Sequence, residues 1–99
     1  MSRATARKVH AMIARHIPGW SFAWLDARSP EYGACLHVSR RIALHPKTPT
    51  TWVLGTIIHE IAHALAGPAA GHGPDFLDQA RRICRAENVP AHQAIGEFS

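Results

Sequence analysis

The spacing of hydrophobic and polar positions predicts which segments of this chain form helices and which form strands. In residues 2–17, apolar side chains recur every three or four positions, which is typical of an amphipathic helix. Residues 20–25 (WSFAWL) alternate large aromatic with smaller side chains, the period of a β-strand. Residues 33–39 and 41–45 predict two further strands that follow each other closely. We therefore expect an N-terminal helix and then a short antiparallel sheet of about three strands.

The second half of the chain predicts two helices. Residues 50–66 follow Pro49, precede Gly67 and contain no proline, which are the start and stop signals of one helix. Apolar side chains cover most of its circumference, so this helix should be central and buried. A second, amphipathic helix is expected from Pro74, because proline suits the first helical position. Residues 91–99 carry no clear pattern, and we expect them to form a loosely held tail.

The central helix carries an HExxH motif, formed by His59, Glu60 and His63. Residues four apart lie on the same face of a helix, so both imidazoles can bind one Zn²⁺ at about 2.0–2.1 Å. Glu60 is rotated by about 100° and lies beside the metal, where it can move a proton from water to a leaving amine. A catalytic zinc usually has three protein ligands. The next histidine along the chain is His72, and eight residues separate it from His63.

The sequence HEIAHAL followed by GHGPDF resembles the SprT-like (Spartan-like) zinc metallopeptidases. The resemblance extends over residues 20–85 and includes the runs YGAC and RIAL ahead of the motif. It implies a zincin-like α+β fold, His72 as the third zinc ligand, and peptide-bond hydrolysis with Glu60 as the catalytic residue. A metzincin is excluded, because the two methionines, Met1 and Met12, lie upstream of the motif and cannot form a Met-turn after it.

The resemblance also implies how a substrate would bind. In zincin-type proteases an edge strand beside the active helix holds the substrate as an added strand, and Arg41–His45 is the candidate here. Tyr32 and His45 are weak candidates for stabilising the oxyanion. Protein or peptide substrates are implied, with DNA-associated proteins among them. The 99 residues lack the cysteine zinc ribbon that many relatives carry, so the expectation of a DNA partner is the less direct one.

Three other interpretations stay open at this point. A deformylase-like amidase joins HExxH to an upstream cysteine, and Cys35 superficially fits that pattern. A zinc-stabilised module without turnover could bind nucleic acid or protein through its arginine and lysine side chains. The simplest alternative is that His59 and His63 are core residues and that Glu60 lies on the surface.

Composition and charge set the remaining expectations. Hydrophobic residues make up 46% of the chain and charged residues 18%, which indicates a folded protein, and we expect residues 1–99 to form one domain. The net charge of +4 permits a polyanionic partner. Cys35 and Cys84 form no close pair, and no apolar run approaches the roughly 20 residues that cross a membrane. We expect a cytoplasmic monomer without a membrane segment.

Overall fold

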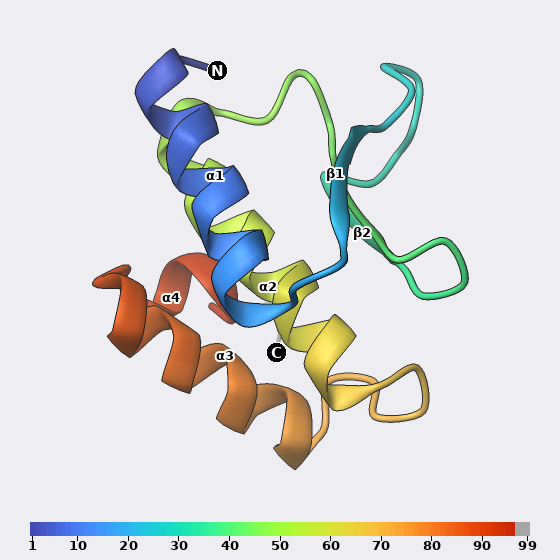
Figure 1. Cartoon of the computed structure of the whole chain (residues 1–99), viewed down its shortest axis with the longest axis vertical. Coiled ribbons are helices and arrows are strands. Elements are labelled where there is room, and N and C mark those ends of the chain that lie inside the picture. Colours follow the sequence, from blue (N-terminus) through green and yellow to red (C-terminus); the bar gives the residue numbers. More distant parts are fainter. Residues whose placement is uncertain (97–99) are drawn as a thin grey trace.

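A computed structural model describes residues 1–96 of the chain as an α+β fold (Figure 1). Residues 97–99, the end of the expected tail, lie outside the described residues. The elements in chain order are the helix α1 (Arg3–His16), the strands β1 (Ser21–Trp24), β2 (Gly33–Leu36) and β3 (Arg41–Leu44), the 3-10 turn η1 (Thr50–Trp52), and the helices α2 (Val53–Ala66), α3 (Pro74–Glu87) and α4 (Ala91–Ala94).

The three long helices begin and end close to where the sequence predicts. α1 starts after Ser2, whose hydroxyl accepts a hydrogen bond from the backbone N–H of Thr5 at 3.1 Å. α3 starts at Pro74 and ends at Asn88, which adopts the left-handed conformation that closes many helices. α2 covers residues 53–66 of the expected helix, and the first three residues of that prediction form the 3-10 turn η1. These elements follow from local signals in the sequence.

The sheet is mixed, so the expectation of an antiparallel sheet is wrong for one of its two pairings. β3 lies in the middle, and β2 pairs with it antiparallel, with Gly33 opposite Leu44. β1 pairs with β3 in parallel, with Ser21 opposite Arg41. Residues 25–32 carry the chain from β1 past β3 to the far side of the sheet before β2 begins. β2 then returns as a hairpin into β3, which therefore runs in the same direction as β1.

The prediction that Arg41–His45 is an edge strand is also wrong. Its residues form β3, which is bonded to a strand on each side, so its backbone groups are used within the sheet. The edges of the sheet are β1 and β2. β2 packs against α2, whereas β1 packs against α1. The edge beside the HExxH helix is therefore β2.

α2 occupies the centre of the fold, as its apolar circumference predicts. Figure 1 shows the sheet on one side of α1 and α2, with α3 and α4 packed against α2 away from the sheet. Ile57, Ile58 and Ile61 of α2 have no exposed surface. The largest other fully buried side chains come from the neighbouring elements α1, β3 and α3: Val9, Met12, Ile42, Leu44, Phe76 and Ile83. Because so many elements contact α2, side chains on this helix are held in fixed positions.

The residues after α3 are not a loose tail as far as the structure describes them. α4 packs against α2 and α3, and Ala94 is only 3% exposed. The contact with α2 is made at Gly55, where an added Cβ would overlap the backbone of Gln93. Glycine at this position therefore lets the two backbones approach each other closely.

Candidate metal centre

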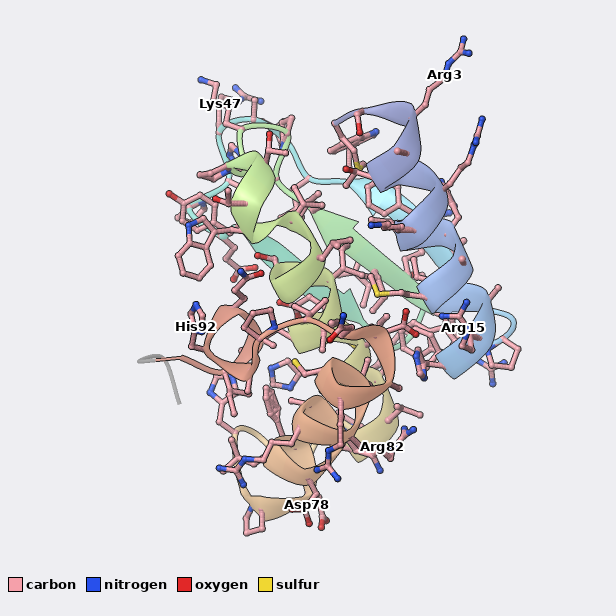
Figure 2. The ribbon with its side chains drawn as sticks, turned by 90° about the vertical axis from the view of Figure 1, so that its left-hand side faces the viewer. Arg3, Arg15, Lys47, Asp78, Arg82 and His92 are labelled. Carbon is pink, nitrogen blue, oxygen red and sulfur yellow. The ribbon has the colours of Figure 1, made fainter. Side chains whose placement is uncertain are left out.

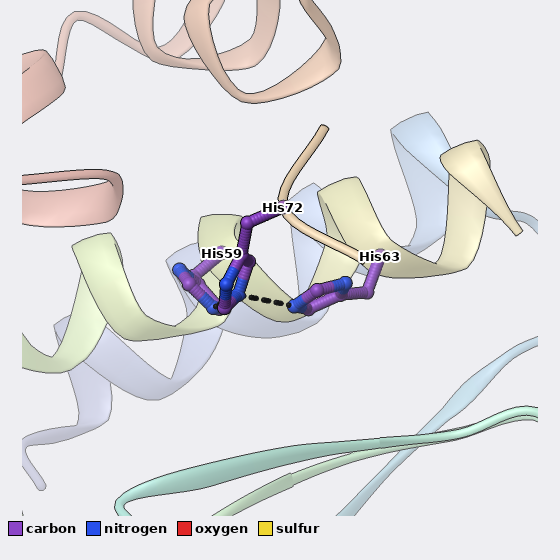
Figure 3. A group of neighbouring side chains, drawn as sticks. All are labelled: His59, His63 and His72. Atoms are coloured by element: carbon purple, nitrogen blue, oxygen red, sulfur yellow. Dashed lines mark hydrogen bonds between the residues drawn. The ribbon is translucent and has the colours of Figure 1, made fainter. Parts of the chain in front are cut away.

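The structure brings His59, His63 and His72 together. His59 and His63 lie one turn apart on α2 and are half-buried, and His72 enters from the exposed loop before α3 (Figure 3). The Nε2 atom of His72 lies 3.1 Å from Nε2 of His63 and 3.2 Å from Nε2 of His59. Two nitrogen ligands at about 2.05 Å from a tetrahedral ion would be separated by about 3.3 Å. The three rings are thus arranged to hold one metal ion.

The ring of Phe76 packs against all three imidazoles. It is fully buried, and its ring centroid lies 4.8 Å from that of His59, 4.5 Å from that of His63 and 4.9 Å from that of His72. Phe76 is two residues beyond Pro74 in the first turn of α3, so the start of this helix fixes both the ring and the loop that carries His72. Packing against this buried ring restricts the rotamers of the three histidines.

A backbone carbonyl of α4 determines which nitrogen of His59 faces the other two rings. Nδ1 of His59 lies 2.7 Å from the carbonyl oxygen of Ala94. A carbonyl only accepts hydrogen bonds, so Nδ1 carries the proton and donates it, and Nε2 keeps its lone pair for a metal. Burial lowers the pKa of His59, the bond to Ala94 opposes that shift, and nearby His72 adds to it. Sequence reasoning missed this partner, and its one signal was Gly55 inside an apolar helix.

His63 is in the protonation state that a metal ligand requires. Burial lowers the pKa of His63 to about 4, and the neighbouring histidines His59, His72 and His37 contribute in the same direction. At pH 7 this ring is therefore neutral. Only neutral imidazole offers a lone pair to a metal ion, so the site does not have to release a proton from His63 before binding.

Glu60 is buried, which contradicts the alternative that places it on the surface. Its exposed fraction is 7%, and it lines a cavity together with His59 and His72. Burial raises its pKa to about 8, and the carboxylate of Glu31 adds to the rise. The space around Glu60 depends on Gly33 of β2, because a Cβ there would lie 3.0 Å from Oε2 of Glu60. A carboxyl group that is buried at such a cavity is suited to exchange protons rather than to form a surface ion pair.

Cys35 is not part of the histidine group. Within residues 1–96, the cluster of side chains able to share a metal consists of His59, His63 and His72. The Cys35 sulfur instead lies 3.5 Å from Nε2 of His37. Burial, with a contribution from Glu60, raises the pKa of its thiol to about 12, so the thiol stays protonated at neutral pH. This placement argues against the amidase interpretation, in which the cysteine would be a ligand.

The two oxyanion candidates have different surroundings. His45 is buried, its Nδ1 accepts a hydrogen bond from the N–H of Lys47 at 3.0 Å, and its Nε2 donates to the carbonyl of Ala27 at 3.1 Å. Both ring nitrogens are therefore used in holding the loops after β1 and β3 together. Tyr32, by contrast, is exposed and lines the cavity beside the histidines. Of the two, only Tyr32 is placed where a substrate could meet it.

Comparisons of the chain with protein-family models, with curated proteins and with solved structures found no match. The likeness to SprT-like proteins therefore rests on the motif residues of this chain. As regards membranes, none of the helices within residues 1–96 is long and apolar enough to cross one.

Proposed function

We propose that the chain is a zincin-like zinc peptidase resembling the SprT-like family, with His59, His63 and His72 as the zinc ligands. The observation that carries the proposal is the convergence of three imidazole nitrogens, all within 4.8 Å of one another, beside a buried carboxyl group. The nitrogen of His72 lies 3.1 Å from that of His63 and 3.2 Å from that of His59. Three histidine nitrogens suit zinc, and a fourth position is then left for water or substrate. When bound, zinc supplies Lewis-acid activation of water and of the scissile carbonyl group.

Glu60 is the proposed general base and acid. It shares a cavity with two of the three ligands, and its raised pKa reflects the cost of holding a negative charge in a buried position. With a divalent cation held by the histidines, that cost would be offset and the pKa of Glu60 lowered, so its carboxylate would be available to accept a proton from the attacking water. Glu60 then delivers this proton to the amine that leaves when the peptide bond breaks.

We place the extended substrate along β2. Among the described residues, β2 has a strand partner only in β3, so one row of its backbone N–H and C=O groups is free to pair with a peptide. Gly33, its first residue, lines the cavity that holds Glu60 and His59. A peptide paired with β2 would bring one of its carbonyl groups close to the histidines. This arrangement replaces the expectation that Arg41–His45 holds the substrate.

The experiment that tests the proposal compares wild type with Glu60→Gln. Metal content, folding by circular dichroism and cleavage of a panel of unfolded proteins are measured on both. We expect about one zinc per chain in each protein, but cleavage only by wild type, because glutamine cannot accept the proton. Equal cleavage by both proteins would refute the role of Glu60. A zinc-loaded wild type that cleaves nothing in the panel would favour the non-catalytic binding module.

The assays should be run with and without DNA. The chain carries a net charge of +4, and Figure 2 shows Arg3 and Lys47 pointing away from the body of the molecule. Exposed cations of this kind support a weak, salt-dependent attraction to polyanions. Faster cleavage of a DNA-bound substrate at low salt, lost at high salt, would support DNA-associated proteins as substrates. An equal rate with and without DNA would remove that part of the proposal.

A further inference from the structure

A cavity of about 490 Å³ extends from the histidines toward the N-terminal end of α2. One wall is a single face of this helix, on which Trp52, Thr56 and His59 follow each other at helical spacing. Trp52 lies seven residues before His59, which corresponds to roughly 10 Å along a helix axis. An extended peptide advances about 3.3 Å per residue, so a side chain that reaches Trp52 belongs to one of about three residues next to the bond at the metal.

The cavity is walled mainly by aromatic and small side chains. Trp52, Pro49, Tyr32, Gly33 and Ala94 of α4 are among the lining residues. Trp52 is 41% exposed and Tyr32 is 61% exposed. Two such large rings around one cavity are unusual on a protein surface unless they serve to bind something.

Both rings are held in place from the protein side. The ring of Trp52 meets His92 of α4 edge-on at a centroid distance of 6.4 Å, and Tyr32 meets His45 in the same way at 6.2 Å. Figure 2 shows His92 at the outer side of α4. Each contact limits the motion of its ring, so less conformational entropy is lost when a ligand packs against it.

The charge of the cavity is one-sided. Among residues 1–96, the acidic side chains that line it are Glu31 and Glu60, and no lysine or arginine does so. Away from the zinc proposed at the histidines, an acidic side chain that entered would find no lysine or arginine of residues 1–96 to pair with, and the carboxylate of Glu31 would repel it. An uncharged apolar side chain meets no such penalty and can pack against Trp52, Pro49 and Tyr32.

We propose that this cavity is a specificity pocket for one large apolar side chain, aromatic or long aliphatic, of the peptide substrate, and that it rejects aspartate and glutamate. The inference rests on the proposed peptidase function, because it assigns the pocket to a residue near the bond that is cleaved. Apolar pockets of enzymes discriminate between side chains of different size by about 10- to 200-fold. Removal of the Trp52 ring should therefore cost at least about tenfold in the binding of a matching peptide.

The test measures binding without turnover. Zinc-loaded Glu60→Gln protein is titrated with fluorescein-labelled decapeptides of glycine, alanine and serine that carry a single phenylalanine, leucine, lysine, alanine or aspartate. We expect the phenylalanine and leucine peptides to bind at least about tenfold more tightly than the alanine peptide, and the aspartate peptide to bind most weakly. Equal binding of all five peptides, or tightest binding of the lysine peptide, would overturn the inference.

Matched variants locate the preference. Trp52→Ala, introduced into the Glu60→Gln protein, should abolish the preference for phenylalanine. Trp24→Ala is the control, because Trp24 is similarly exposed (53%) but lies on β1, outside the cavity. Should Trp52→Ala not fold, Tyr32→Ala serves the same purpose, because Tyr32 also lines the cavity. A preference that survives the loss of either ring contradicts the proposed pocket.

The outcome also separates this inference from the proposed function. If the peptides bind with the expected preference but the wild type cleaves none of them, the pocket stands and the peptidase function fails. If the wild type cleaves all five at equal rates and Trp52→Ala leaves those rates unchanged, the peptidase function stands and the pocket fails.

Discussion

Replacement of Glu60 by glutamine should stabilise the metal-free protein at alkaline pH. The carboxyl group is 7% exposed, and burial raises its pKa from 4.5 to about 8. An acid whose pKa is raised by folding contributes stability that is fully present below pH 4.5 and is lost as the pH rises through 8. At about 1.36 kcal/mol for each pH unit, the interval from 4.5 to about 8 corresponds to a loss of about 5 kcal/mol. This is an upper bound, because a buried site relaxes and admits water when it becomes charged.

The assay is urea unfolding of EDTA-treated wild type and Glu60→Gln between pH 5 and pH 9. The free energy of unfolding of the wild type should fall by up to about 4 kcal/mol relative to the variant across this range, because about three pH units of the interval lie above pH 5. Other titrating groups are common to both proteins, so they cancel in the difference. Added zinc should remove most of the loss in the wild type, because the cation stabilises the carboxylate. Glu31→Gln, at an exposed carboxylate on the same cavity, should give a much smaller difference.

Parallel stability curves for wild type and Glu60→Gln would refute this reasoning. Such a result would mean that the carboxyl group titrates alike in the folded and unfolded chains. Glu60 would then be solvated in solution, and its burial could not prepare it for proton transfer.

Four other perturbations have defined outcomes. Gly55→Ala should push α4 and the carbonyl group of Ala94 away from His59. Loss of such a partner typically weakens metal binding by about 10- to 100-fold, which competition with a chelator measures. Unchanged affinity would contradict the role of α4. His72→Ala should empty the metal site in elemental analysis, whereas Cys35→Ala should leave it full, and the reverse pattern would restore the amidase interpretation. Acidification should release zinc around or below pH ~6 as the imidazoles protonate, and full retention at pH 4 would contradict a histidine site. Glu87→Gln should lower the free energy of unfolding above pH 4.5, because hydrogen bonds with Arg15 and His16 of α1 outweigh the effect of burial and hold the pKa of Glu87 below its usual value. This contribution should vanish as the pH falls further. An unaltered denaturation midpoint at pH 7 would count against it.

The local part of this protein could be predicted from its sequence. The spacing of apolar residues gave the three long helices, and Pro74 and the apolar run before Gly67 gave boundaries that the structure keeps within a few residues. That His59 and His63 share a face follows from the helix period alone. The burial of α2 follows from its apolar circumference. In each case the signal and the structure involve residues within a few positions of each other.

Strand pairing and the surroundings of the site were decided by the tertiary structure. No local pattern in the sequence indicates which strands lie beside β3, because the strand order depends on the path of residues 25–32 around the sheet. The approach of His72 to the other two rings depends on how α3 packs against α2 through Phe76. The carbonyl that orients His59 belongs to a segment 35 residues away, and a backbone acceptor leaves no trace in side-chain chemistry. The sequence by itself determined the ligands' residue types and the helix that carries two of them, since both depend on short-range geometry. Their convergence, and the burial that raises the pKa of Glu60, come from packing between distant segments, which only the folded chain defines.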